Sequence, residues 1–178
     1  YSVFTYFSKK WHDREKREPV DAPSSDDLAD VADDEPVPSL GDLRFKEPDA
    51  VIPSASTEAA RERLESFCED AIYRYEERRD YPADGCTSRL SPHLKFGTIG
   101  IREVYDTTDR AHADAPSEGA RESVFEFQDQ LAWREFYTQV LEANPQVVTE
   151  NFKEYDNPIA WRDDPEALQA WYSTTAAP

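Results

Sequence analysis

Apolar residues recur at steps of three and four along the chain after residue 55. Behind the hydroxyls of Ser56 and Thr57, this apolar series comprises Ala60, Leu64, Phe67, Cys68, Ala71, Ile72 and Tyr75. The spacing places these side chains on one face of an amphipathic helix, and either hydroxyl can cap its first turn. We predict a helix from residue 56 to about Asp80, because Pro82 disfavours the helical conformation at the residue before it.

Two short helices are expected next. Pro92 suits the first turn of a helix, with Ser91 as the N-cap, and Gly97 can end that helix. The second short helix is predicted from Thr98 through Val104.

A long helix is predicted over residues 117–143, which contain no proline. Its apolar residues occupy more than one face, as is typical of a helix buried between neighbours; they are Val124, Phe127 and Leu131 on one face and Trp133, Phe136 and Val140 on another. A last helix is expected after Asp164 as N-cap and Pro165 in the first turn. We expect it to bury Leu168, Trp171 and Tyr172.

The first 55 residues follow a different pattern. Residues 1–7 form a strand-like aromatic run, and a charged stretch follows. Residues 19–40 contain seven carboxylates, four prolines and no Lys or Arg, so they bury too little apolar surface to fold. We therefore divide the chain into residues 1–18, an acidic linker of residues 19–55 and a helical domain of residues 56–178. The expected fold class is mainly α.

Charge limits the possible functions. The 178 residues include 38 Asp and Glu against 20 Lys and Arg, and the net charge of −18 excludes binding of nucleic acid through bulk positive charge. So acidic a chain suggests a halophilic source, with an ordinary acidic mesophile as the alternative. Mean hydropathy is −0.83, and the sequence shows neither a membrane-spanning run nor a secretion signal. We expect a soluble, cytoplasmic protein.

Metal and disulfide chemistry are not indicated. Cys68 and Cys86 lie far apart, and His12, His93 and His112 have no metal-ligand spacing with carboxylates or cysteines. We expect surface or capping histidines and no metal site. The chain starts with Tyr and contains no Met, so we expect it to be a piece of a longer protein.

The most informative stretch is Thr87-Ser-Arg-Leu-Ser-Pro-His-Leu-Lys-Phe-Gly97. Its three hydroxyls lie just before or at the start of a predicted helix, where free backbone N–H groups and the helix dipole favour an anion such as a diphosphate. A hydroxyl-rich capping turn without a ligand explains the same residues.

This stretch resembles the Thr-Ser-x-Leu-Ser-Pro-x-Leu-x-Phe-Gly signature of the photolyase/cryptochrome family. Further segments resemble the family in the same order, and several ordered motifs together are far more specific than one. They are Tyr1-Ser-Val-Phe-Thr with Trp11, Tyr75-Glu-Glu-Arg-Arg-Asp-Tyr-Pro82, Gln130-Leu-Ala-Trp-Arg-Glu-Phe-Tyr137, and Asn157-Pro-Ile-Ala-Trp161 through Trp171. The resemblance implies that residues 1–18 end an N-terminal α/β antenna domain. It also implies that residues 56–178 form the first half of a helical FAD-binding domain.

The resemblance assigns roles to individual residues. The implied FAD-binding residues are Tyr75, Thr87, Ser88, Arg89, Leu90, Ser91, Phe127 and Arg134. Gln130 and Trp133 correspond to residues that contact the damaged pyrimidine pair, which makes them the implied catalytic residues. The implied DNA-binding residues are Arg79, Gln130, Trp133, Arg134 and Tyr137. The residues alone favour a different interpretation, in which Trp133 is a buried aromatic and Arg134 forms a surface ion pair with Glu135 or Glu126.

The implied function is repair of cyclobutane pyrimidine dimers by a deoxyribodipyrimidine photo-lyase, through electron transfer from light-excited, reduced FAD. Gln130 stands where photolyases acting on these dimers usually have Glu. It therefore leaves open a 6-4 photolyase or a cryptochrome-type photoreceptor. The resemblance further implies a folate or deazaflavin antenna pigment in the missing domain, DNA as partner and a monomer. After Trp171 the family's glycines are absent, so we expect this chain alone to bind FAD weakly or not at all and to be inactive.

Overall fold

The computed structural model describes residues 3–29, 36–46, 49–153 and 162–175, and every regular element among them is helical. The chain divides into two compact units, Tyr1–Val140 and Leu141–Pro178. None of the described helices is long and apolar enough to span a membrane.

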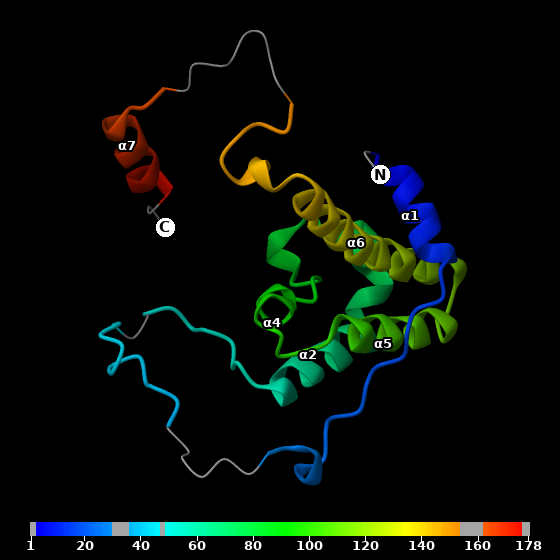
Figure 1. Ribbon diagram of the computed structural model, residues 1–178. Coiled ribbons are helices and arrows are strands. Elements are labelled where there is room, and N and C mark those ends of the chain that lie inside the picture. The colour runs from blue at the N-terminus through cyan, green and yellow to red at the C-terminus, as the bar shows by residue number, and fades with distance from the viewer. Residues whose placement is uncertain (1–2, 30–35, 47–48, 154–161, 176–178) are drawn as a thin grey trace. The chain divides into compact units, whose positions relative to one another are not determined.

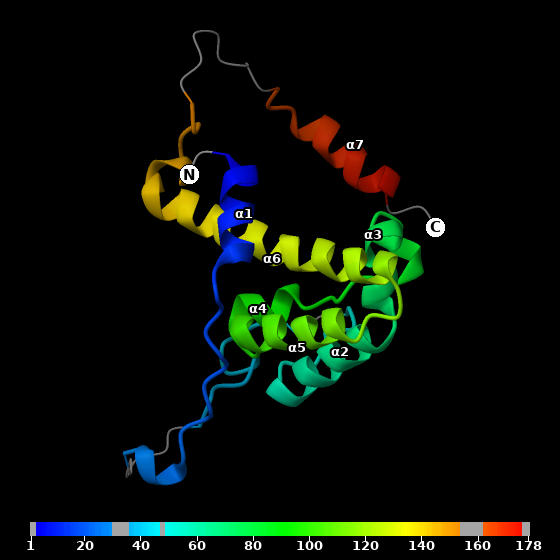
Figure 2. The same ribbon diagram turned by 90° about the vertical axis from the view of Figure 1, so that its right-hand side faces the viewer.

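The first unit is built around α6, Glu118–Ala143, with α1, Phe4–Asp13, and α5, Ile101–Ala113, against it (Figures 1 and 2). The other elements of this unit are α2, Thr57–Glu69; α3, Tyr75–Arg78; α4, Ser91–Phe96; and the 3-10 turns Ser25–Asp27, Ala71–Arg74 and Pro82–Asp84. The main core combines α2, the turn Ala71–Arg74, α3, the loop before α4, α5 and α6; its fully buried members include Leu64, Ile72, Leu90, Val104 and Val124.

The strand expected at the N-terminus is wrong, because residues 4–13 form α1. The aromatic run suggested a strand, but Phe4, Phe7 and Trp11 recur at helical steps and pack with Ala132 and Phe136 of α6 as a second cluster. Tertiary burial of this face decides the local conformation.

The helix predicted from residue 56 to Asp80 is interrupted. α2 begins as expected, with the Ser56 hydroxyl accepting a bond from the N–H of Ala59 at 3.0 Å, but it ends at Glu69. Ser123 of α6 stabilises the break, because its Oγ donates to the Ile72 carbonyl at 2.7 Å and accepts from the Glu76 N–H at 3.1 Å. The predicted apolar stripe is therefore divided among three elements, α2, the 3-10 turn Ala71–Arg74 and α3.

The two short helices predicted after residue 90 are both present, as α4 and α5, but they begin and end at other residues than predicted. α4 is capped by Leu90, so Ser91 is its first helical residue, and Gly97 ends it in the left-handed conformation at φ 73°. α5 starts at Ile101 rather than Thr98 and runs nine residues past Val104, because Val104, Thr108 and Ala111 continue one buried face.

His93 was expected on the surface or at a cap, but it is 3% exposed. Its Nδ1 lies 2.8 Å from the Thr98 hydroxyl, across the turn that follows α4. The imidazole therefore tethers that turn from within the core.

The predicted long helix is confirmed as α6, which spans 26 residues. In the second unit, α7, Pro165–Thr175, begins as predicted, with the Asp164 carboxylate accepting from the Ala167 N–H at 3.0 Å. The expected burial of Leu168, Trp171 and Tyr172 is wrong, since all three are more than half exposed. The described part of this unit, which also holds the turn Pro145–Val148, contains no buried residue that could cover them.

Candidate functional site

A cavity of about 590 Å³ lies in the first unit, between α3, α4, the loop before α4, and α6. All eight residues expected to bind a cofactor line it, together with Gln130, Leu94, Lys95 and Leu131. Segments up to 59 residues apart in sequence therefore converge on one hollow, as the ordered motifs predicted.

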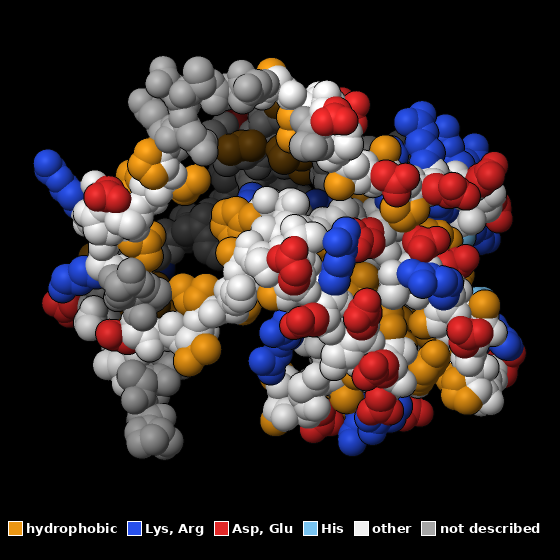
Figure 3. All heavy atoms as spheres, turned by 90° about the horizontal axis from the view of Figure 1, so that it is seen from below, with side chains coloured by type: hydrophobic (Ala, Val, Ile, Leu, Met, Phe, Trp, Pro, Cys, Tyr) orange, Lys and Arg blue, Asp and Glu red, His pale blue; other side chains and the backbone are white. Residues whose placement is uncertain are grey.

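The lining is positively charged in a strongly acidic chain. Arg89, Lys95 and Arg134 contribute cations, and the described residues that line the cavity include no carboxylate. Figure 3 shows acidic and basic side chains interspersed over the face of the molecule seen from below. Local cations free of carboxylates, together with hydroxyl donors, are suited to an anion such as a phosphate.

The loop of residues 87–90 is held in an unusual conformation. Arg89 has φ 51°, in the left-handed region, where a residue with a Cβ costs about 1 kcal/mol. The Leu90 N–H approaches the Ser88 hydroxyl at 3.4 Å, and the hydroxyls of Thr87 and Ser91 have no partner among the described residues. Both residues are exposed, so their hydroxyls are open to solvent and available to a ligand.

The same loop borders a second hollow of about 560 Å³. Thr87, Ser88 and Arg89 line both, but the second hollow also contains Glu62 beside Arg63. The carboxylate makes the second hollow less suited to an anion than the first.

Aromatic rings form the apolar wall of the first cavity. Phe127 lies 5.3 Å from the Tyr75 ring and 4.8 Å from the Phe67 ring, measured between centroids. Burial raises the pKa of Tyr75, although the nearby Arg79 opposes that shift. The phenol therefore stays protonated at neutral pH and can donate a hydrogen bond.

The guanidinium of Arg134 lines the cavity and is available to an anionic ligand. Its Nη2 donates to the Leu94 carbonyl at 3.4 Å, and no described carboxylate pairs with it. The alternative of an ion pair with Glu135 or Glu126 is wrong, because Glu135 accepts from Trp11 Nε1 at 2.6 Å and Glu126 pairs with Arg79.

Trp133, Tyr137 and Arg79 do not line this cavity. Trp133 stacks on Phe4 of α1 with centroids 3.4 Å apart and planes 10° from parallel, and it also stacks on Tyr137 at 5.4 Å. Arg79 Nη1 lies 2.6 Å from Glu126 Oε1. The residues expected to meet DNA are therefore split between the cavity wall, the α1 contact and an ion pair.

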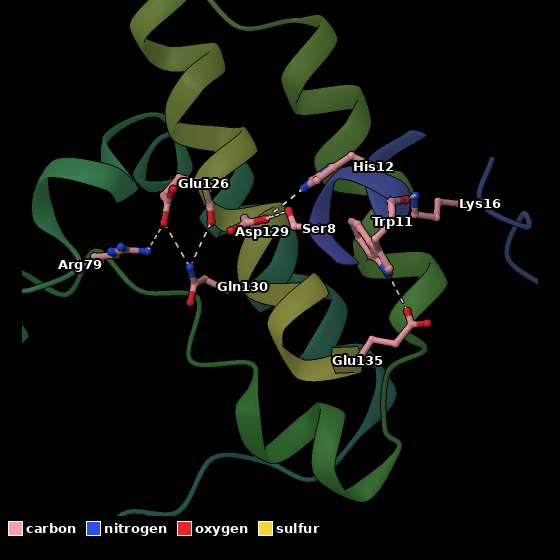
Figure 4. Close-up of polar contacts among 9 residues, drawn as sticks. All are labelled: Ser8, Trp11, His12, Lys16, Arg79, Glu126, Asp129, Gln130 and Glu135. Carbon is pink, nitrogen blue, oxygen red and sulfur yellow. Dashed lines mark hydrogen bonds and ion pairs between the residues drawn. The ribbon is translucent and has the colours of Figure 1, made fainter. Parts of the chain in front are cut away.

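A polar cluster ties α1 to the opposite face of α6 (Figure 4). Ser8 Oγ donates to Asp129 Oδ1 at 2.5 Å, and His12 Nε2 lies 3.3 Å from the same oxygen. Burial lowers the pKa of His12 more than Asp129 raises it, so the ring is neutral at pH 7. No metal-binding group of three or more His, Cys, Asp or Glu occurs among the described residues.

Sequence reasoning considered Glu126 only as a possible partner of Arg134 and missed its contact with Gln130. Its carboxylate contacts Gln130 as well as Arg79. The signal that was available is the four-residue spacing of Glu126 and Gln130, which places neighbours on one helix face.

Comparisons with known proteins agree with the motifs. A family model described as the FAD binding domain of DNA photolyase matches residues 127–176. The deoxyribodipyrimidine photo-lyase of Halobacterium salinarum is 58% identical over 175 residues, covering 96% of this chain and 36% of that protein. The enzyme of the same name from Synechococcus sp. is 34% identical over 181 residues, covering 96% and 37%. The similarity to a Halobacterium protein supports the expected halophilic source.

The fold has a counterpart among solved structures. A crystal structure of a bacterial class III photolyase from Agrobacterium tumefaciens matches with a TM-score of 0.80 and 26% identity, covering 96% of this chain and 36% of that chain. The chain thus spans little more than a third of the length of these relatives.

Proposed function

The chain belongs to the DNA photolyase family, and from this premise we propose that it forms the FAD-binding and lesion-binding part of a light-driven DNA-repair enzyme. Its substrate in this proposal is the cyclobutane pyrimidine dimer. The observation that carries the proposal is the cationic cavity lined by all eight expected flavin-binding residues.

The lining fits the chemistry of FAD. Arg89, Lys95 and Arg134, with the hydroxyls of Thr87 and Ser91, are suited to the two phosphates, while Tyr75, Leu90 and Phe127 offer apolar surface to rings. When bound and reduced, FAD supplies a light-excited electron that splits the dimer and then returns. In this proposal Gln130 hydrogen-bonds the lesion, Arg79 meets a DNA phosphate, and the apolar wall keeps water out.

The proposal also includes Trp133 and Tyr137 as DNA contacts and residues 1–18 as the end of an antenna domain for a folate or deazaflavin. Since Phe4 covers the indole of Trp133, a base can stack there only after that ring moves. This part of the proposal therefore requires the Phe4 ring to leave the indole when DNA binds.

Flavin binding tests the site directly. We expect the chain in concentrated KCl to quench FAD fluorescence only weakly, and we expect Arg134→Ala to lower that weak affinity by about tenfold or more, because a charged hydrogen bond to phosphate is lost. Arg110→Ala on α5, outside this cavity, is the matched control. Equal affinities of the three proteins would contradict the assignment of the cavity.

Repair itself distinguishes the second candidate. The second candidate is a 6-4 photolyase or a cryptochrome-type photoreceptor, because proteins of that branch also have Gln at the position of Gln130. Illuminated protein with reduced FAD is mixed with DNA containing both lesions, and each lesion is counted against a dark control. Loss of cyclobutane dimers alone supports the proposal, and loss of 6-4 products supports that alternative. Flavin binding without repair is expected of this partial chain and supports a photoreceptor only when it is found in a full-length protein.

A further inference from the structure

Gln130 is held on one side by Glu126, one helical turn earlier on α6. Gln130 Nε2 lies 3.2 Å from Glu126 Oε1 and 3.5 Å from the Glu126 carbonyl oxygen. Figure 4 shows the amide nitrogen toward Glu126 and the amide oxygen on the opposite side. Gln130 lines the cavity, whereas Glu126 is not among the residues that line it.

The chemistry of the pair permits one orientation of the amide. An ionised carboxylate and a backbone carbonyl can only accept hydrogen bonds, so the group that faces them must be the NH₂. Both contacts use that nitrogen, and no described residue donates to Gln130 Oε1. The side chain therefore offers an acceptor to anything that enters the cavity.

Glu126 is itself fixed by Arg79, at the end of α3. Arg79 Nη1 donates at 2.6 Å to the same Oε1 that receives the Gln130 amide. Burial lowers the pKa of Arg79, but Glu126 and the Tyr75 hydroxyl together raise it more, so the guanidinium stays charged. The Arg79 guanidinium also lies over the Tyr75 ring, 5.7 Å from its centroid.

We propose that Glu126 is a positioning residue that turns the carbonyl of Gln130 toward the ligand, so that this site selects a group presenting an N–H. The imide N3–H of a pyrimidine has that chemistry, and a ring methylated at N3 does not. The inference rests on the proposed function, because it assumes that a pyrimidine lesion enters the cavity. Its selectivity comes from an acceptor that is left unpaired when the N–H is missing.

The contact can be tested without any ligand. In the ¹⁵N spectrum of the chain, the Gln130 side-chain NH₂ is assigned by its absence from Gln130→Leu. We expect slow exchange of this NH₂ with water in the parent chain and fast exchange in Glu126→Ala, with circular dichroism showing that both are folded. Equal exchange in the two proteins would overturn the positioning role.

The selectivity is tested with a labelled oligonucleotide containing one cyclobutane thymine dimer, and the same oligonucleotide methylated at both N3 atoms, by anisotropy in the dark. We expect the parent chain to prefer the unmethylated dimer by about tenfold and Glu126→Gln to reduce that preference to about twofold. Because Glu126→Gln also releases Arg79 and removes a negative charge, affinity for every DNA changes, and only the ratio is informative. Glu122→Gln, an exposed site one turn earlier on α6, makes the same charge change and should keep the tenfold ratio.

The two proposals can fail separately. An unchanged ratio in Glu126→Gln overturns the inference while lesion binding by the parent still supports the proposed function. If the parent binds damaged and undamaged DNA equally, the proposed function fails, and the lesion selectivity fails with it even where the NH₂ exchange supports the Glu126 contact.

Discussion

On one side of α6, Phe127, Gln130 and Arg134 line a cavity, while on the other side Trp133 and Phe136 are covered by α1. Both sides use aromatic and polar residues, so composition does not separate them. Trp133 and Arg134 are adjacent in sequence and about 100° apart around the helix. Position around one helix thus decides whether a side chain is available to a ligand or serves packing.

The largest test of this comparison is Phe127→Ala, because Phe127 serves both the cavity wall and the main core. The ring is 5% exposed and contacts Phe67 and Tyr75. We expect a loss of about 3–4 kcal/mol in the free energy of unfolding, measured by urea denaturation. Phe125→Ala, where the ring is 45% exposed, is the matched control and should cost less than half as much. Similar losses at the two sites would mean that the cavity wall is not part of the core.

Neighbouring substitutions separate the two faces more sharply. Trp133→Ala removes the stacked contact with Phe4 and should cost about 2 kcal/mol of stability without changing FAD affinity. Arg134→Ala should weaken FAD binding and leave stability within about 0.5 kcal/mol. Thermal denaturation gives the stability of each variant, and flavin titration gives its affinity for FAD. A fall in FAD affinity with Trp133→Ala would show that the faces are coupled.

A fall in pH tests the α1 side through His12. Burial lowers the pKa of His12 below its ordinary 6.5, so the unfolded chain binds this proton more readily than the folded one. The stabilisation is therefore complete above pH 6.5 and is lost as pH falls through the folded pKa. We expect the parent to lose more thermal stability between pH 7.5 and 5.5 than His12→Gln does. If the melting temperatures of the two proteins fall in parallel as the pH is lowered, His12 does not contribute to the pH dependence of stability.

The smallest effect is expected at the outer edge of the α1 contact. Glu135 accepts a hydrogen bond from Trp11 Nε1 in an exposed position, so Glu135→Gln should change stability by less than about 0.5 kcal/mol. The melting temperature at low and high salt measures it. A loss above 1 kcal/mol would show that this edge is far less open to water than its exposure indicates.

Local signals predicted much of the helical region. The absence of proline marked α6, and Asp164 with Pro165 marked the start of α7, because capping depends on residues within a few positions. The ordered motifs also placed eight residues around one cavity. These features are written in short stretches of sequence.

The features that could not be predicted depend on contacts between residues far apart in the sequence. The break after Glu69 is stabilised by Ser123 of α6, and the helical form of residues 4–13 depends on Phe136, more than 120 residues away. The ring of Trp133 could be placed only once α1 was known to cover it. Likewise, the orientation of the Gln130 amide follows from Arg79 and Glu126 acting together, which no single motif contains.

The 26 residues of α6 extend about 39 Å as one uninterrupted helix, and this makes the gene sensitive to changes in length. One residue inserted after Gln128 would rotate everything beyond it by about 100°. Asp129 would then occupy the position of Gln130, facing the carboxylate of Glu126, and Trp133 would occupy the position of Arg134. A single codon gained or lost in this stretch would therefore replace the side chains that line the cavity and those that contact α1 at the same time, although the helix itself would still form.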